Sequence, residues 1–419
     1  MIRTLRIAGF KSLTDVTLEL PRLAVFFGPN AVGKSNILDA IQILARFGTY
    51  RTLAEAVEGR EIRGYPIEQF TFPDGGLPEL LGKDEQQLEF QADIEADLEI
   101  GSKMTLEAIR YKLTLAIQPR SGSLSVVDEF LARLLPSLQP RGKPSLEKVD
   151  GKLHIRKMKQ GRPEQEQLRK NHTILSDPRR GGAYYPVLEA VRGALQGVRT
   201  YYLDPRISMR EAVPPREVDD IGTLGQHLAP FLYRLSRTEP KCFDAAARTL
   251  RMIIPSVESL TVELDDRRGT LDLQVHQNGK NFSARMISEG TLRLLGLAAI
   301  AVNPWNARVI AFEEPENGVH LRRLDLIAQL LASLALDRGR QVIVTSHSPH
   351  FCQQILALQR EAPDDIGLFI ISHSGGATRC ERLTAIGPLF EDSEVRRAMT
   401  ARGEDGMFER MVLRGLAGG

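Results

Sequence analysis

Apolar and polar residues alternate over residues 2–20, which predicts a half-buried hairpin or meander of strands. The five residues 23–27 are all apolar, as expected for a strand buried on both faces. A glycine-containing turn follows, and residues 35–47 then carry apolar positions at helical spacing. The start of the chain therefore predicts antiparallel strands, a buried strand, a turn and a helix.

The pattern weakens between residues 46 and 219, which we expect to form an inserted α+β lobe. Residues 88–118 alternate and predict an antiparallel strand pair, whereas residues 127–138 have helical spacing. Residues 139–182 are rich in proline, glycine and basic residues and show poor periodicity. This composition predicts a protruding, mobile segment.

Strand and helix patterns alternate through the second half of the chain. Such alternation is typical of α/β proteins with parallel strands, which we expect to join the buried strand at 23–27. The predicted helices cover residues 221–255, 294–302 and 322–336, and the predicted strands cover residues 259–284, 308–314, 340–348 and 366–383.

Bulk properties exclude several classes of protein. The 419 residues suggest one large domain with an insertion, or two lobes. The formal net charge of +2 gives no global argument for binding polyanions. The three cysteines, Cys242, Cys352 and Cys380, are scattered, which indicates a reduced, cytoplasmic chain. The start has no signal-peptide pattern, and no run reaches the roughly 18 uncharged apolar residues of a membrane span.

A phosphate-loop pattern, G-x-x-x-x-G-K-[ST], follows the buried strand and precedes the helix. Its glycines let backbone N–H groups point at phosphate oxygens, Lys34 can reach the β- and γ-phosphates, and the Ser35 hydroxyl can bind Mg²⁺. The alternative is a strand–helix turn without a ligand. The candidate nucleotide-binding residues are Gly28, Pro29, Asn30, Ala31, Val32, Gly33, Lys34, Ser35 and Asn36.

Two later strands end in polar residues. Neighbouring residues of a strand point to opposite sides, so we expect Glu313 and Glu314 to have different roles. Glu313 is the candidate Mg²⁺ ligand, and Glu314 is the candidate general base. At the end of the strand 340–348, His347 can hold a γ-phosphate or an attacking water. The alternatives are a solvated acidic strand end and a structural histidine.

The stretch Ser288-Glu289-Gly290 precedes a helix. The Ser288 hydroxyl can donate a hydrogen bond, Gly290 permits close backbone approach, and a helix N-terminus favours anions. The alternative is an ordinary N-cap, in which Ser288 or Thr291 accepts hydrogen bonds from backbone N–H groups.

These motifs, in this order, resemble the ABC-type ATPase superfamily. More narrowly, "FKS", "GPNAVGKSN", "SEGT", "EEPENGVH" and "TSHSP" are similar to the SMC/RecF-like AAA ATPases related to the overcoming-lysogenisation-defect family. The resemblance covers roughly residues 1–45 and 220–355. It implies that residues 28–35 are the Walker A loop, 313–314 the Walker B end, His347 the switch histidine and 288–290 the signature.

The resemblance implies an α/β P-loop NTPase of the ABC/SMC-head type. This fold has a mixed central sheet with flanking helices, an N-terminal antiparallel β-subdomain and an inserted α+β lobe. We expect a discontinuous ATPase core at 1–45 and 220–375, the inserted lobe at 46–219 and a C-terminal tail at 376–419. In that family the signature, here Ser288 and Gly290, binds the γ-phosphate of ATP held by the other protomer.

The implied ligands are ATP and Mg²⁺, and the implied assembly is a homodimer or higher homo-oligomer formed through ATP. Glu313 stands where many ABC ATPases have Asp, and Gln69 is the candidate for the Q-loop glutamine. Only about 70 residues follow "TSHSP", which is too short for a fused TOPRIM nuclease. A separately encoded nuclease or other effector is therefore expected.

The expected output is a DNA-related task, in repair or anti-phage defence. Within 141–180, twelve basic residues oppose five acids, and such a patch can neutralise nucleic-acid phosphates. The alternatives are a solvated loop or a surface for an acidic protein. A different class of function is a nucleotide-gated scaffold that holds a protein partner with slow, regulatory hydrolysis. The basic residues are Arg141, Lys143, Lys148, Lys152, Arg156, Lys157, Lys159, Arg162, Arg169, Lys170, Arg179 and Arg180.

Overall fold

The computed structural model describes residues 1–158, 161–305 and 307–383. The chain forms two compact units, which we describe separately. Among the described residues, unit 1 comprises 1–21, 29–198 and 371–381, and unit 2 comprises 22–28, 199–370 and 382–383. Lys159 and the part of the predicted tail beyond residue 383 lie outside the described residues.

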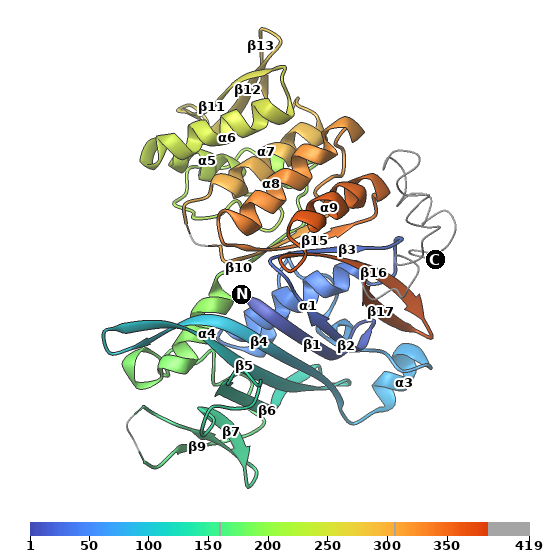
Figure 1. The fold of residues 1–419 in the computed structure, drawn as a ribbon, viewed down its shortest axis with the longest axis vertical. Helices are drawn as coiled ribbons and strands as arrows, with labels where there is room; N and C mark the ends of the chain where they lie inside the picture. Colours follow the sequence, from blue (N-terminus) through green and yellow to red (C-terminus); the bar gives the residue numbers. More distant parts are fainter. Residues whose placement is uncertain (159–160, 306, 384–419) are drawn as a thin grey trace. The chain divides into compact units, whose positions relative to one another are not determined.

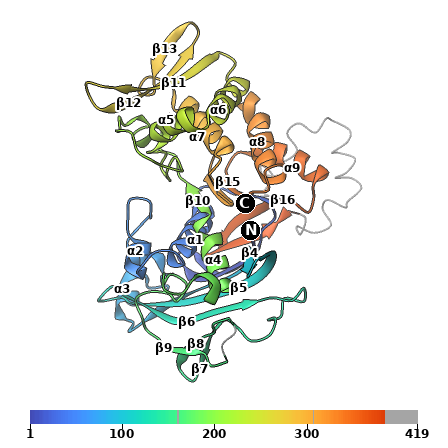
Figure 2. The ribbon, with the colours of Figure 1, turned by 90° about the vertical axis from the view of Figure 1, so that its left-hand side faces the viewer.

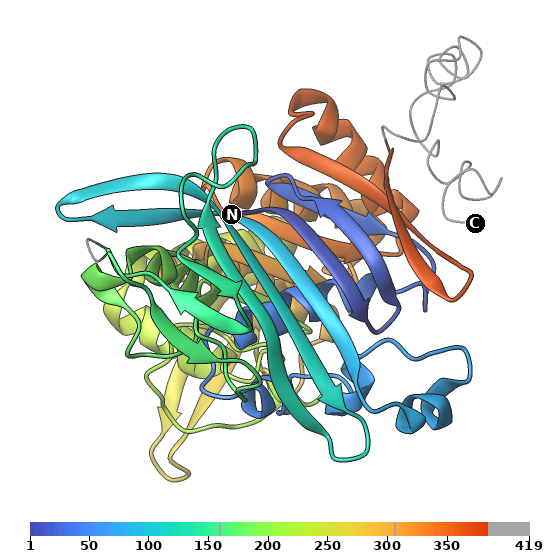
Figure 3. The same ribbon diagram turned by 90° about the horizontal axis from the view of Figure 1, so that it is seen from below.

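An eight-stranded sheet forms the centre of unit 1, in the order β2-β1-β4-β5-β6-β7-β8-β9. β1 pairs antiparallel with both β2 and β4, so the N-terminal strands and the predicted pair at 88–118 belong to one sheet. The long hairpin of β4 and β5 is coloured cyan and teal in Figure 3. The strands are β1 Ile2–Phe10, β2 Leu13–Glu19, β4 Gln86–Ile100, β5 Lys103–Gln118, β6 Ser123–Arg133, β7 Leu146–Val149, β8 Lys152–Ile155 and β9 Glu164–Gln167.

Helices pack on this sheet through apolar faces. α4 contacts β4, β5 and β6, and α1 contacts α4 (Figure 1). α1 begins directly after Gly33, whose left-handed backbone turns the chain out of the preceding loop. The helices of unit 1 are α1 Lys34–Phe47, α2 Leu53–Val57, α3 Gly76–Gly82 and α4 Pro186–Gln196, with short 3₁₀ turns at Pro66–Gln69 and Gly182–Tyr184.

The helix predicted at 127–138 is wrong, because residues up to Arg133 belong to β6. A β-bulge explains the error. Leu115 pairs with Val126 while Thr114 pairs with Asp128, so Val127 is an extra residue in the strand. The bulge interrupts the two-residue period, and the interrupted pattern imitates helical spacing.

The basic, proline-rich segment 139–182 contributes the strands β7, β8 and β9 to the sheet. Each of these strands has only four residues, which is too short for a periodic signal. The ladder from β6 through β9 is antiparallel throughout. The mobility of this segment and the domain boundaries inferred from the sequence stay predictions.

Unit 2 contains a mostly parallel sheet in the order β10-β14-β15-β3-β16. β3 pairs in parallel with β15 on one side and β16 on the other, as the sequence predicted. All five residues of β3 are buried. The strands are β3 Leu23–Phe27, β10 Val198–Tyr201, β14 Val309–Glu313, β15 Gln341–Ser346 and β16 Ile366–Ser374, and β17 Ala377–Arg382 follows β16 and lies mainly within unit 1.

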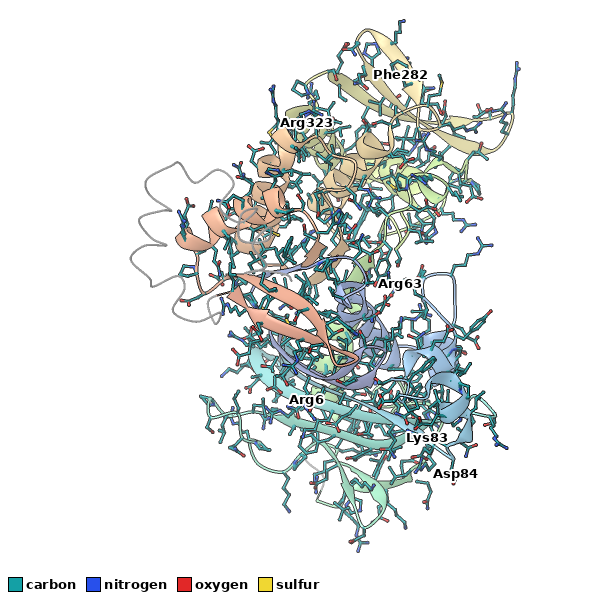
Figure 4. All side chains as sticks on the ribbon, turned by 90° about the vertical axis from the view of Figure 1, so that its right-hand side faces the viewer. Arg6, Arg63, Lys83, Asp84, Phe282 and Arg323 are labelled. Atoms are coloured by element: carbon teal, nitrogen blue, oxygen red, sulfur yellow. The ribbon has the colours of Figure 1, made fainter. Side chains whose placement is uncertain are left out.

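Helices α8 and α9 pack against β3, and α8 also packs against β15 (Figure 1). A separate three-stranded sheet, β11-β12-β13, packs on α5 and α6 (Figure 2) and includes Phe282 (Figure 4). None of the described helices is long and apolar enough to cross a membrane.

The helices of unit 2 are α5 Leu228–Thr238, α6 Pro240–Ile253, α7 Glu289–Val302, α8 Leu324–Leu336 and α9 Pro349–Glu361. Short 3₁₀ turns occupy Ser208–Arg210 and Leu321–Arg323. The strands of the separate sheet are β11 Val257–Asp265, β12 Thr270–Gln277 and β13 Lys280–Ser283.

A buried carboxyl group joins two parts of unit 1. Glu129 of β6 is fully buried and accepts hydrogen bonds from the backbone N–H groups of Ile174 and Leu175, at 2.6 and 3.0 Å. The Tyr111 hydroxyl donates to the same carboxyl group at 3.0 Å. Burial raises the pKa of Glu129 to about 7, because these hydrogen bonds only partly offset the loss of solvation.

Glu129 should make folding less favourable as pH rises. Its folded pKa of about 7 exceeds the ordinary value of 4.5, so the folded state holds its proton more tightly. The stability present below pH 4.5 should be lost progressively up to pH 7, by roughly 3 kcal/mol in total. Thermal unfolding from pH 4.5 to 7.5 measures this, with Glu129→Gln as the uncharged control. Parallel pH profiles for the two proteins would contradict the assignment.

Candidate functional site

The phosphate loop leaves β3 at Gly28, and the boundary between the two units falls between Gly28 and Pro29. Within the loop, Ala31 and Gly33 adopt left-handed backbone conformations, with φ angles of 68° and 99°. Such conformations turn successive N–H groups toward one concave side, and α1 adds its N-terminal N–H groups. This backbone fits a loop that binds phosphate.

The side chains of the loop are ordered by contacts within unit 1. The Lys34 amino group donates to the carbonyl of Pro29 at 2.8 Å, and Lys34 is only 5% exposed. The backbone N–H of Asn36 donates to the carbonyl of Gly33 at 3.0 Å, which forms the first turn of the helix. Val32 is buried, whereas Asn30 and Ala31 are exposed at the tip of the loop.

A charged cluster supports the first turns of α1. The Arg63 guanidinium (labelled in Figure 4) donates to the carboxylate of Asp39 at 2.9 Å and to the carbonyl of Ser35 at 3.2 Å. The Lys11 amino group donates to the same carboxylate at 2.7 Å. Gln69 is fully buried, and its amide donates to the carbonyl of Arg63 at 3.0 Å. In this structure Gln69 therefore fixes the turn that carries Arg63, and its Q-loop role stays a prediction.

In unit 2, three neighbouring parallel strands end at the same edge of the sheet. Thr345 of β15 pairs with Glu313 of β14 on one side and with Phe26 of β3 on the other. The residues that follow these strands therefore leave the sheet at one level. The edge carries Glu313 and Glu314, the segment of His347, and Gly28 at the start of the phosphate loop.

Glu314 and His347, which the sequence singled out separately, are in contact. The His347 Nδ1 atom lies 3.0 Å from a carboxylate oxygen of Glu314, and the Asn317 amide donates to the other oxygen at 2.6 Å. Glu314 has a φ angle of 46°, which is unusual for a residue with a long side chain. The contacts with His347 and Asn317 orient its carboxylate, and its side chain is 20% exposed, so water can reach it. The motif "EEPENGVH" contains Asn317, but the sequence pattern did not single it out.

Glu316 is a buried acid beside Glu314 that the sequence did not single out. It is 5% exposed, and one of its carboxylate oxygens accepts a hydrogen bond from the Ser346 hydroxyl. Its other oxygen has no hydrogen-bond partner in the described part of the chain. Burial raises the pKa of Glu316, and the bond from Ser346 opposes this shift. The backbone N–H of Ser348 also donates to Ser346, so Glu316 links the turn after β14 to the segment of His347.

Ser288 is the N-cap of α7 in this structure. Its hydroxyl oxygen accepts a hydrogen bond from the backbone N–H of Thr291 at 3.1 Å, so the cap interpretation holds within the single chain. Gly290 also has a local explanation. A Cβ atom at this position would lie less than 3.0 Å from the carbonyl oxygen of Gly318.

A cavity of about 410 Å³ lies beside the start of α7. Arg206 pairs with Glu289 at its rim, at 3.0 Å. Burial lowers the pKa of the Arg293 guanidinium, whereas nearby carboxylates, that of Glu314 foremost, oppose this shift. The cavity lies wholly within unit 2 and is lined by Leu203, Asp204, Pro205, Arg206, Glu289, Arg293, Asn317 and Gly318.

Comparisons with known proteins agree on the kind of fold. A family model described as "AAA domain, putative AbiEii toxin, Type IV TA system" matches residues 23–352. The structure resembles an SMC head bound to the C-winged helix domain of ScpA, with a TM-score of 0.53 and 13% identity over 91% of this chain and 98% of that chain. It also resembles the Pyrococcus furiosus SMC head with an extended coiled coil bound to the C-terminal domain of ScpA, with a TM-score of 0.54 and 13% identity over 94% and 99%.

These likenesses confirm the predicted fold, an α/β fold of the SMC-head type. The narrower relation to the overcoming-lysogenisation-defect family is not confirmed. A comparison with curated proteins found no match.

The contact between Gly290 and Gly318 should make any side chain at position 290 destabilising. Gly290→Ala should lower the free energy of unfolding by about 1–3 kcal/mol, because the added carbon meets rigid backbone. Denaturant unfolding measures this change. Gly193 lies in a helix and has open space around it, so Gly193→Ala should stabilise instead, by about 0.5–1 kcal/mol. Equal effects of the two changes would contradict the local role of Gly290.

Proposed function

Because the chain belongs to the AAA-domain family whose model matches residues 23–352, we propose that it binds and hydrolyses ATP with Mg²⁺. One observation carries the hydrolytic part of this proposal. The carboxylate of Glu314 is held by His347 and Asn317 at the sheet edge where β3 also ends. An oriented carboxylate beside a histidine is an arrangement suited to proton transfer.

In this proposal the loop from Gly28 to Asn36 holds the triphosphate. The N–H groups of the loop and of the start of α1 bind phosphate oxygens, and Lys34 exchanges its bond to Pro29 for the β- and γ-phosphates. Ser35 and Glu313 would hold Mg²⁺, which neutralises charge on the phosphates. Oxygen ligands of this kind suit a hard cation.

Glu314 accepts the proton of the attacking water. Its carboxylate is accessible, whereas the deeper Glu316 is 5% exposed and bonded to Ser346. His347 and Asn317 each contact one oxygen of Glu314, so they fix the plane of the carboxylate. Replacing Glu314 by Gln removes the proton acceptor and keeps the shape of the side chain.

The proposal includes a dimer with two ATP molecules, each completed by Ser288 and Gly290 of the other copy. The family resemblance of "SEGT" supports this arrangement, as does the N-terminus of α7, where N–H groups favour an anion. The Ser288 hydroxyl accepts from the backbone N–H of Thr291 and lies 2.8 Å from the Thr291 hydroxyl. Ser288 can donate to the other copy when the Thr291 hydroxyl is the donor in that pair.

Slowed hydrolysis should trap the dimer. The Glu314→Gln variant with saturating ATP and Mg²⁺ should elute at twice the monomer mass in size-exclusion chromatography with light scattering, and its ATPase rate should fall at least about 100-fold. Ser288→Arg in the same background should bind one ATP per chain and remain monomeric, because the added side chain blocks the contact with the second copy. Ser102→Arg, at an exposed turn, is the matched control. A monomeric Glu314→Gln protein, or a dimeric double variant, contradicts the ATP-bridged dimer.

The output of hydrolysis is proposed to be a DNA-related task, in repair or anti-phage defence, performed with a separately encoded effector such as a nuclease. Direct DNA contact through residues 141–180 has little support, because most of their basic groups pair with carboxylates inside unit 1. A nucleotide-gated scaffold without DNA contact is the alternative that this pairing favours. The pairs are Arg141–Glu107, Arg156–Glu147, Lys157–Glu164, Arg169–Glu85, Lys170–Glu166, Arg179–Asp177 and Arg180 with Glu164 and Glu166.

Neutralising three of the basic residues of 141–180 that have no ion pair in the described part of unit 1 should leave any DNA affinity almost unchanged. For Lys143, Lys148 and Lys152 changed together to Gln, the slope of log affinity against log salt should shift by less than about 1. Fluorescence anisotropy with duplex DNA across a salt series measures it. A shift approaching about 3 would show that these residues contact DNA phosphates, and strong stimulation of the ATPase rate by DNA would favour the DNA-related task over the scaffold.

A further inference from the structure

The last described strand of the chain contacts the phosphate loop. Thr378 lies in β17 and is 2% exposed. Its hydroxyl donates to the carbonyl of Val32 at 2.9 Å, across 346 positions in the sequence. Its backbone N–H donates to the carbonyl of Ser12 at 2.9 Å, which fixes β17 to the turn between β1 and β2. These residues all belong to unit 1.

Hydrogen bonds between side chains connect this contact to the start of α1. The Asn36 amide donates to the Ser12 hydroxyl oxygen at 2.8 Å, and the hydroxyl groups of Ser12 and Thr378 are 2.7 Å apart. The Thr378 proton is directed at the carbonyl of Val32, so Ser12 must donate to Thr378. The result is one directed series of bonds, from Asn36 through Ser12 and Thr378 to Val32.

The series ends on the peptide group that joins Val32 to Gly33. Val32 lies between the two left-handed residues Ala31 and Gly33. The peptide bond is planar and trans, so the Val32 carbonyl and the Gly33 N–H point in opposite directions. Holding the carbonyl against Thr378 therefore directs the Gly33 N–H away from Thr378, toward the other side of the loop.

Packing reinforces this constraint. A Cβ atom on Gly33 would lie less than 3.0 Å from the hydroxyl oxygens of both Thr378 and Ser12. The second glycine of the phosphate-loop pattern is therefore required by contact with these hydroxyl groups, as well as by its left-handed backbone. The loop cannot approach the two hydroxyls this closely with any other residue at position 33.

We propose that Ser12 and Thr378 are positioning residues for the nucleotide, and that they preset the Gly33 N–H to bind a phosphate oxygen. Neither side chain touches the nucleotide in this assignment. The assignment rests on the proposed ATP binding. It gives residue 378 a role in nucleotide affinity, although residues 376–419 were expected to be a tail.

Thr378→Val tests the proposal, because valine keeps the shape of threonine and lacks the hydroxyl. It should weaken binding of MgATP labelled with a fluorophore on the ribose, and raise KM for ATP, by about tenfold. The kcat value should change less than about twofold, since Thr378 acts on binding and not on the proton acceptor. Thr378→Ser keeps the hydroxyl and should retain wild-type affinity.

Hydrogen exchange without nucleotide separates this proposal from the proposed function. Backbone amides of residues 30–36 should exchange faster in Thr378→Val than in wild type or Thr378→Ser, while circular dichroism shows all three folded. If residues 30–36 of Thr378→Val exchange at the wild-type rate, the positioning role is overturned. It is also overturned if Thr378→Ser loses as much affinity for MgATP as Thr378→Val does. If the wild-type protein binds no MgATP, the proposed function fails, and the nucleotide-positioning role fails with it. Faster exchange in Thr378→Val would then show only that Thr378 orders the loop.

Discussion

The parallel pairing of β3 with β15, and of β15 with β14, is the constraint on which the candidate site depends. It aligns Phe26, Thr345 and Glu313 across three strands, so the segments that follow leave the sheet at one edge. Parallel strands need long connections, and in this chain those connections supply the helices α7 and α8 and the polar turns. Candidate residues that lie about 320 positions apart in the sequence, from Gly28 to His347, therefore follow the ends of adjacent strands.

The sheet brings the ends of its strands close together, and buried polar groups then hold the loops that follow these strands. Glu316 joins the turn after β14 to Ser346, and Thr378 joins the phosphate loop to the turn at Ser12. Hydrogen bonds of this kind are strong in a low-dielectric interior and depend on geometry. Because these bonds are directional, they hold the turn after β14 and the loop after β3 in defined positions. Several of the groups nearest the proposed chemistry are therefore structural in role.

The candidate site could be predicted from the sequence wherever its signal was local. The candidate phosphate-loop residues 28–36 are consecutive and run from the end of a strand into a helix, and Glu313, Glu314 and His347 lie at the ends of two recognisable strands. Glu316 and Asn317 lie within the motif "EEPENGVH", but no sequence pattern distinguishes a buried carboxylate from a solvated one. Ser12 and Thr378 carried no signal at all, because their importance arises only from contact across hundreds of residues.

The sequence by itself determined the local elements, the P-loop class and the order of the motifs, since periodicity and glycine placement act over a few residues. Tertiary structure decided which strands became neighbours: β1 with β4 in one antiparallel sheet, and residues 123–133 as a bulged strand instead of a helix. It also decided that Gly290 lies close to the backbone of Gly318, and that most basic groups of 141–180 form ion pairs with carboxylates. The physical reason is that pairing, burial and ion contacts depend on partners distant in sequence, which local preference does not encode.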